Sequence, residues 1–210
     1  MTIDEARSAL VELERGYENK TQSFGPQQWV DNFNNADDVG RARSHEVAWA
    51  LVFEGTSDER RYALAFWNVV GIPQGVSDAV ADLYLTEDPP DPNLRQSLGL
   101  STSHRFSDDV GRRLAARFAA DPDGERELAG NAVRYDAQGA AWDALIRLVL
   151  KTDDVVGIYK LFDAAYQADR SDDFFAAIKK KPEALLKEMA GSVPLKMRQR
   201  FVQITGITFP

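Results

Sequence analysis

The chain has no cysteine and no long apolar run. A fold held by disulfides and a metal site built on thiolates are therefore excluded. The most compact apolar stretches, VAWALVF at 47–53 and VVGI at 69–72, are far shorter than the roughly 18 residues expected of a membrane-spanning helix. The first residues include Asp4 and Glu5 and do not have the pattern of a signal or transit peptide. We therefore expect a cytoplasmic protein with no membrane partner.

Complete catalytic motifs are also missing. The two histidines, His45 and His104, do not provide the second histidine at i+4 that a helical zinc-protease motif requires. No GxSxG motif, Walker loop or Rossmann glycine pattern occurs. A zinc site built from His45, Glu46 and a distant Asp stays open, although a lone histidine beside a glutamate is more often a surface or packing residue. We expect no cofactor, no metal and no enzymatic activity.

Charge is distributed unevenly along the chain. The chain carries 33 acidic and 25 basic residues, a net charge of -8 at pH 7. Residues 175–210 contain seven Lys or Arg and two Glu, a net charge of +5, which leaves -13 for residues 1–174. An acidic surface repels the phosphate backbone that supplies most nonspecific affinity for nucleic acids. The composition therefore favours a basic protein partner over direct binding of a duplex.

Apolar residues recur at helical spacing along most of the chain. The stretch AAWDALIRLVL, residues 140–150, has one apolar stripe at i, i+3, i+4, i+7 and i+8, formed by Trp142, Leu145, Ile146, Val149 and Leu150. No stretch combines strand-like alternation with hairpin turn residues. Breaks rich in Gly, Pro and Asp separate the periodic stretches and predict roughly ten to twelve short helices. The predicted fold class is all-α.

We expect these helices to form one α-helical domain covering residues 1–210. The least regular segment, residues 86–106, contains EDPPDPN and runs into the polar LSTSHRFS, and we expect it to be a long loop or a partly ordered linker. If the chain is divided, this segment would separate an N-terminal helical part, residues 1–85, from a C-terminal helical part, residues 107–210.

Three similar segments carry paired aspartates: ADDVGRA at 36–42, SDDVGRR at 107–113 and TDDVVGI at 152–158. All-α terpene and prenyl transferases hold magnesium with aspartates at i, i+1 and i+4. The i+4 residues here are Arg41, Arg112 and Gly157, so the third ligand is missing each time. A metal-dependent enzyme that uses these pairs stays an alternative.

Helix capping accounts for the same aspartates without a metal. The first Asp of a pair would accept hydrogen bonds from free backbone N–H groups, and the second would lie in the first turn, where the helix dipole favours negative charge. Capping is the favoured interpretation. It leaves Gly40, Gly111 and Gly157 unexplained, because glycine near a helix start costs stability and suggests close packing against a neighbour.

Helix starts near Asp38, Asp58 and Asp78 are about 20 residues apart, a rhythm that fits stacked helix–turn–helix units. In DDVGRRLAARF, residues 108–118, Asp and Val are followed by a basic residue and paired alanines, at Asp109, Val110, Arg112, Ala115 and Ala116. This pattern resembles the second helix of HEAT-type repeats, and SDERRYALAFW, residues 57–67, is a looser match. The resemblance covers about half of the chain and ends near residue 150. It implies a stacked helical array that acts as a binding surface, with an irregular multi-helix bundle as the alternative fold.

The aromatic residues divide into two groups. Trp49, Phe53, Phe66, Trp67 and Trp142 lie in strongly apolar stretches and are expected in the core. Trp29 has polar neighbours, and this suits an exposed anchor at an interface. Core placement of Trp29 is still slightly favoured.

The expected function is that of a non-enzymatic macromolecular binding protein. One concrete form is an inhibitor or immunity-type protein whose acidic helical surface masks the basic active site of a toxin. The first alternative is an accessory subunit of a nucleoprotein complex that uses the basic C-terminal segment. The candidate partner-binding residues are Trp29, Lys179, Lys180, Lys181, Arg198 and Arg200.

Overall fold

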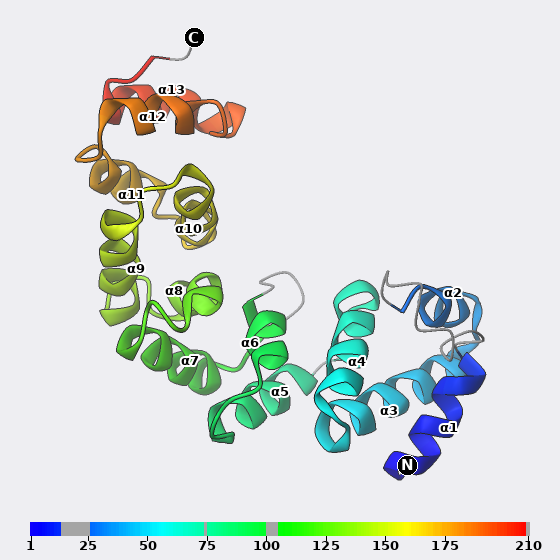
Figure 1. Ribbon diagram of the computed structural model, residues 1–210. Coiled ribbons are helices and arrows are strands. Elements are labelled where there is room, and N and C mark those ends of the chain that lie inside the picture. The colour runs from blue at the N-terminus through cyan, green and yellow to red at the C-terminus, as the bar shows by residue number, and fades with distance from the viewer. Residues whose placement is uncertain (14–25, 74, 100–104, 209–210) are drawn as a thin grey trace. The chain divides into compact units, whose positions relative to one another are not determined.

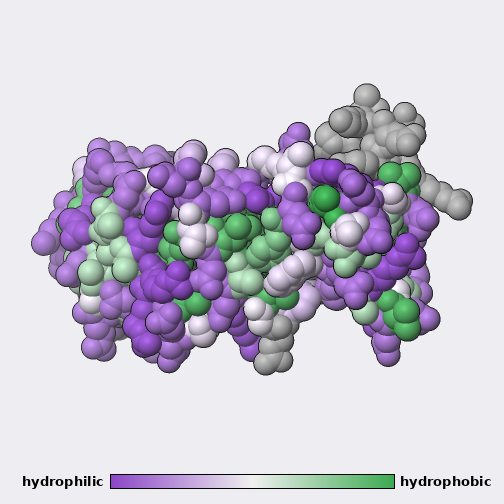
Figure 2. Space-filling model, turned by 90° about the horizontal axis from the view of Figure 1, so that it is seen from below, coloured by the Kyte–Doolittle hydropathy of each residue, from purple (hydrophilic) through white to green (hydrophobic). Residues whose placement is uncertain are grey.

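The computed structural model describes residues 1–13, 26–73, 75–99 and 105–208 (Figure 1). These residues form thirteen α-helices and one short 3₁₀ helix, and they contain no strand. The all-α prediction is therefore confirmed, and the number of helices is slightly higher than predicted. None of these helices is long and apolar enough to cross a membrane. The face seen in Figure 2 is mostly hydrophilic, with smaller apolar areas between the polar residues.

The chain divides into two compact units, unit 1 from Met1 to Ser107 and unit 2 from Asp108 to Pro210. Unit 1 contains α1 (Ile3–Leu13), α2 (Gln27–Asn35), α3 (Asp38–Glu54), α4 (Ser57–Val70), α5 (Val76–Thr86) and α6 (Pro92–Gly99). Unit 2 contains α7 (Asp108–Ala120), η1 (Arg126–Leu128), α8 (Ala129–Tyr135), α9 (Ala140–Lys151), α10 (Val155–Gln167), α11 (Ser171–Ile178), α12 (Glu183–Ala190) and α13 (Leu195–Thr205).

Within each unit, a helix packs against the next helix but one, and many helices also pack against a sequence neighbour. In unit 1, α3 contacts α1, α4 and α5, and α4 also contacts α2 and α6. In unit 2, α7, α9, α11 and α13 form one row, and α8, α10 and α12 form a second row (Figure 1). The arrangement of helices in two rows therefore continues in unit 2 beyond residue 150, although the sequence resemblance to helical repeats ends there.

Helix α6 lies inside the segment 86–106, for which the sequence predicted a loop or linker. Pro92 occupies the first helical position, where its missing N–H costs nothing, and the Asp91 carboxylate accepts a hydrogen bond from the N–H of Asn93. Leu94 and Leu98, one turn apart, are fully buried, and α6 packs against α4 and α5. Burial against neighbouring helices therefore stabilises a short helix in a segment whose prolines suggested a loop.

Helices α3 and α4 form the hairpin that positions the candidate site. The Asp37 carboxylate caps α3 by accepting the N–H of Gly40 at 2.8 Å. Thr56 and Glu59 form a reciprocal capping box at the start of α4. The buried apolar side chains of the two helices include Val47, Ala48, Leu51, Leu64, Phe66 and Trp67. The hairpin is therefore fixed at both helix starts and along its packed faces.

Candidate functional site

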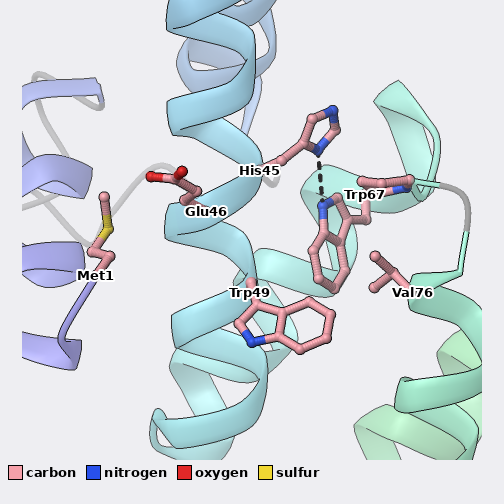
Figure 3. A pocket seen from close by; sticks show the side chains of 7 residues that line it. Met1, His45, Glu46, Trp49, Trp67 and Val76 are labelled. Atoms are coloured by element: carbon pink, nitrogen blue, oxygen red, sulfur yellow. Dashed lines mark hydrogen bonds between the residues drawn. The ribbon is translucent and has the colours of Figure 1, made fainter.

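A cleft of about 330 Å³ lies beside α3 and α4 in unit 1 (Figure 3). The residues that line it are Met1, His45, Glu46, Trp49, Trp67, Pro73 and Val76. Most of these side chains are apolar or aromatic, and Glu46 is the only carboxylate among them. The volume lies at the lower end of the range of about 300–1,000 Å³ found for ligand pockets.

Trp49 is the exposed aromatic residue of this cleft. Its exposed fraction is 43%, so the prediction that Trp49 belongs to the core is wrong. Its indole stacks on Phe53 one turn later, with the ring centroids 4.3 Å apart. The flanking residues Ala48 and Ala50 are buried, because α3 contacts helices on several sides. In a stretch as uniformly apolar as VAWALVF, sequence periodicity does not reveal which side chain faces solvent.

His45 and Trp67 form a polar contact in the cleft wall. The indole N–H of the fully buried Trp67 donates to Nδ1 of His45 at 3.2 Å (Figure 3). To accept this bond, Nδ1 must be unprotonated, so the neutral ring carries its proton on Nε2. Burial lowers the pKa of His45 below its ordinary value of 6.5. His45 therefore orients an aromatic wall and stays neutral near pH 7.

Glu46 lies at the edge of the cleft, on the same helix as Trp49 and three residues before it (Figure 3). Residues spaced i and i+3 are neighbours on a helix surface. Glu46 is exposed, and within the part of the chain that the structure describes it makes no hydrogen bond or ion pair. Its carboxylate is therefore available to a cation from outside the chain.

The net charge of the protein is confined to unit 1. Residues 1–107 contain 17 acidic and 9 basic residues, a difference of -8, whereas residues 108–210 contain 16 of each. The basic C-terminal segment is thus balanced by acidic residues of the same unit. The cleft belongs to the unit with the acidic excess.

The described residues contain no group of three His, Asp or Glu side chains that could hold a metal. The zinc alternative built on His45 and Glu46 therefore lacks a third ligand among them. The other histidine, His104, lies outside the described residues.

Trp29, a candidate partner-binding residue, is fully buried in α2. Its ring stacks on Phe66 of α4, with the centroids 4.0 Å apart. Its polar neighbours Gln27 and Asn32 are exposed. Trp29 therefore does not fit the role of an exposed anchor and fits the favoured alternative, a core residue. The polar neighbours belong to the outer face of an amphipathic helix, whose opposite face buries Trp29.

Lys181, another candidate, is buried and bonded within the chain. Its Nζ donates to the carbonyls of Leu150 and Thr152, each at 2.6 Å, and lies 3.2 Å from Asp153. A cation at this position complements the negative end of the α9 dipole. Lys181 is therefore part of the fold, and as placed it is not available to a partner.

The remaining basic candidates lie directly after α11 and in α13. Arg200 binds the Asp172 carboxylate through hydrogen bonds of 2.6–2.8 Å, and Arg198 donates to the carbonyl of Val193. Lys179 and Lys180 are exposed, and within the described ranges their side chains make no hydrogen bond or ion pair. Among the five predicted cations, Lys179 and Lys180 are therefore the exposed ones that make no such contact within the described ranges.

The aspartate pairs all lie at helix starts. Asp37 caps α3, as predicted for the first Asp of a pair, and Asp38 lies in the first turn. In the pair 153–154 the second Asp is the cap, because Asp154 accepts the N–H of Gly157 at 2.6 Å. Asp108 and Asp109 both lie in the first turn of α7. All three pairs therefore mark helix starts, but the predicted arrangement, with the first Asp as the cap and the second in the first turn, is found only for Asp37 and Asp38.

The glycines of these segments are explained by two kinds of close approach. A Cβ on Gly111 would lie 2.3 Å from the Tyr135 ring of α8. At Gly157 it would lie 2.6 Å from the capping Asp154 carboxylate, and at Gly40 it would lie 2.9 Å from Cβ of Ala36. The expected packing against a neighbouring helix is therefore found at Gly111, whereas a Cβ would clash with the capping Asp154 at Gly157 and with the preceding Ala36 at Gly40.

The cleft combines an apolar wall, one exposed indole and one unpaired carboxylate. These groups suit noncovalent binding of a cation, because an aromatic face and a carboxylate both attract positive charge. The Nδ1 atom of His45 is already occupied by Trp67. In comparisons with protein-family models, curated proteins and solved structures, no match to this chain is found.

Proposed function

We propose that this chain is a non-enzymatic binding protein that captures a basic protein partner through unit 1. The observation that carries this proposal is the confinement of the net charge of -8 to the unit that also contains the Trp49 cleft. Opposite charge speeds association and selects partners, and tryptophan is over-represented among the residues that dominate binding energy. An inhibitor of the immunity type, which masks a basic active site, is the concrete form that we favour.

The arrangement of the helices supports the same proposal. Both units contain helices that pack in two rows, with each helix contacting the next but one. Stacked arrays of this kind, including the HEAT-type repeats that the sequence resembles, present extended surfaces to macromolecules. A HEAT-like array would therefore offer unit 1 a long acidic surface in addition to the cleft.

The test is a comparison of two charge-matched variants of the full chain, each used to capture partners from the native cell lysate. The first replaces four exposed carboxylates of unit 1, Glu46→Gln, Glu54→Gln, Asp58→Asn and Asp88→Asn. The second replaces four of unit 2, Asp143→Asn, Asp163→Asn, Asp169→Asn and Glu188→Gln.

We expect the unmodified chain and the unit 2 variant to retain a basic protein in stoichiometric amount, and the unit 1 variant to retain much less. Equal retention by the two variants would contradict the role of unit 1. The absence of any stoichiometric protein would contradict the proposed function itself.

A second candidate function is an accessory subunit of a nucleoprotein complex, which the exposed Lys179 and Lys180 favour. Two adjacent lysines with free side chains can contact phosphate. Lys179→Gln with Lys180→Gln should abolish retention of nucleic acid, whereas Lys187→Gln should not, because Lys187 pairs with Glu183 at 2.7 Å. Unchanged retention by the double variant would rule this function out.

A further inference from the structure

The cleft of unit 1 suits a long side chain that is apolar along its stem and cationic at its end. Trp49, Trp67, Pro73 and Val76 provide the apolar wall, and Glu46 provides a carboxylate at the edge (Figure 3). Lys and Arg side chains bury their methylene stems against apolar surface while the charged end reaches a polar group. No Lys or Arg of the described chain lines the cleft, so the matching cation must come from elsewhere.

The exposed indole favours arginine over lysine. A planar guanidinium stacks on an aromatic ring and can bind a carboxylate through two parallel hydrogen bonds, whereas an ammonium group is a compact point charge. The same chain already forms such a stack in unit 2, where the guanidinium of Arg170 lies 4.1 Å from the ring centroid of Trp142. Trp142 is covered by this contact and its neighbours and is only 7% exposed, whereas Trp49 is 43% exposed.

We propose that the cleft receives an arginine side chain of the basic partner, with the guanidinium over Trp49 and paired with Glu46. The acidic excess of unit 1 favours a cation at this position. The inference rests on the proposed function for the source of the arginine. The site itself can be tested without the partner, because a single amino-acid derivative contains all the groups that the cleft would contact.

The experiment follows the tryptophan indole N–H resonances of the full chain by NMR during titration with N-acetyl-L-arginine methylamide. We expect saturable shifts at Trp49, assigned by the loss of its signal in Trp49→Phe, and at the neighbouring Trp67. The lysine derivative should bind more weakly, and the uncharged norleucine derivative should give no saturable shift. Glu46→Gln should weaken binding by about two- to fivefold, the range of a solvent-exposed ion pair.

Glu54→Gln is the matched control, because Glu54 is exposed on the same helix but does not line the cleft. It should leave the affinity for the arginine derivative unchanged. Equal binding of the arginine and norleucine derivatives, an unchanged affinity in Glu46→Gln, or no saturable shift would each overturn the inference. If the arginine derivative binds as expected but no protein partner is captured, the site stands and the proposed function falls. If Glu46→Gln and Trp49→Leu each capture the partner as well as the unmodified chain, the function stands and the inference falls.

Discussion

Gly111 shows how a missing side chain lets two helices approach each other. A Cβ at this position would lie 2.3 Å from the Tyr135 ring, so α7 and α8 can pack this closely only with glycine there. In an isolated helix, Gly→Ala stabilises by about 1 kcal/mol. Overpacking of a well-filled contact costs about 1–3 kcal/mol, and we expect it to outweigh the helix propensity here.

Gly111→Ala should therefore lower the free energy of unfolding, measured by urea denaturation, in spite of the better helix former. The control is the same substitution in a Tyr135→Ala background, where the clash is absent and Gly111→Ala should be neutral or stabilising. A gain in stability from Gly111→Ala with Tyr135 present would show that the two helices do not pack this closely.

Glu59 links the start of α4 to α1. Its carboxylate lies 2.7 Å from the Arg7 guanidinium and accepts the N–H of Thr56, and these contacts, Arg7 first, lower the pKa of Glu59 from 4.5 to about 2. Between these two values the unfolded chain binds a proton that the folded chain does not. The stabilisation is therefore present above pH 4.5 and is lost as the pH falls towards 2.

We expect Glu59→Gln to flatten the dependence of stability on pH between about 4.5 and 2, because the amide keeps a capping acceptor but does not titrate. Unfolding curves recorded across this range would measure the effect. Asp58→Asn, a change at an exposed carboxylate of the same turn, should alter the slope less. An identical slope in Glu59→Gln and the unmodified chain would contradict the role given to Arg7.

At the scale of helices, the two aspartates of a pair are expected to contribute unequally to stability. In the pairs 37–38 and 153–154, only one Asp accepts a backbone hydrogen bond at the helix start. Asp37→Ala removes the acceptor of the Gly40 N–H and should destabilise the protein by about 1 kcal/mol. Asp38→Ala removes only a first-turn charge and should cost less, about 0.3–1 kcal/mol. Urea denaturation of both variants would measure the difference. A larger loss for Asp38→Ala would contradict the assignment of the cap.

Lys181 connects two elements of unit 2, since it follows α11 and its Nζ binds the C-terminal carbonyls of α9. Lys181→Met keeps the stem but removes the charged donor from the part-buried carbonyl of Leu150 and the buried carbonyl of Thr152, and we expect a loss of about 1.5–3 kcal/mol in the free energy of unfolding. The exposed neighbour provides the comparison: Lys180→Met should change stability by less than about 0.5 kcal/mol. Similar values for the two variants would mean that the Lys181 bonds contribute little.

At the scale of the whole molecule, the uneven division of charge predicts that binding of the proposed basic partner is sensitive to salt. Screening shortens the reach of charges from about 10 Å at 0.1 M salt to about 3 Å at 1 M. We expect the association rate with the captured partner to fall steeply over this range while the dissociation rate changes little. Stopped-flow mixing would measure both rates. An association rate that does not depend on salt would contradict electrostatic capture by unit 1.

Much of the secondary structure could be predicted from local signals. Apolar residues at helical spacing predicted the all-α class, and paired aspartates marked the starts of α3, α7 and α10. Helix α6 was missed, because its only apolar signal is the pair Leu94 and Leu98 among prolines and polar residues. The stripe predicted for α9 was partly wrong: Leu150 is exposed and Leu148 is buried. Contacts of α9 with α7, α8 and α11 widen its buried face beyond what one stripe describes.

The sequence by itself determined the helical class, several helix starts and the net charge, because these depend on residues a few positions apart or on composition alone. Only the tertiary structure decided that Trp29 is buried, that Trp49 is exposed beside Glu46, and that Lys181 binds carbonyls of α9. Each of these outcomes depends on which helices lie against a given side chain. The partners that bury or expose a residue are distant in the chain, and local spacing carries no information about them.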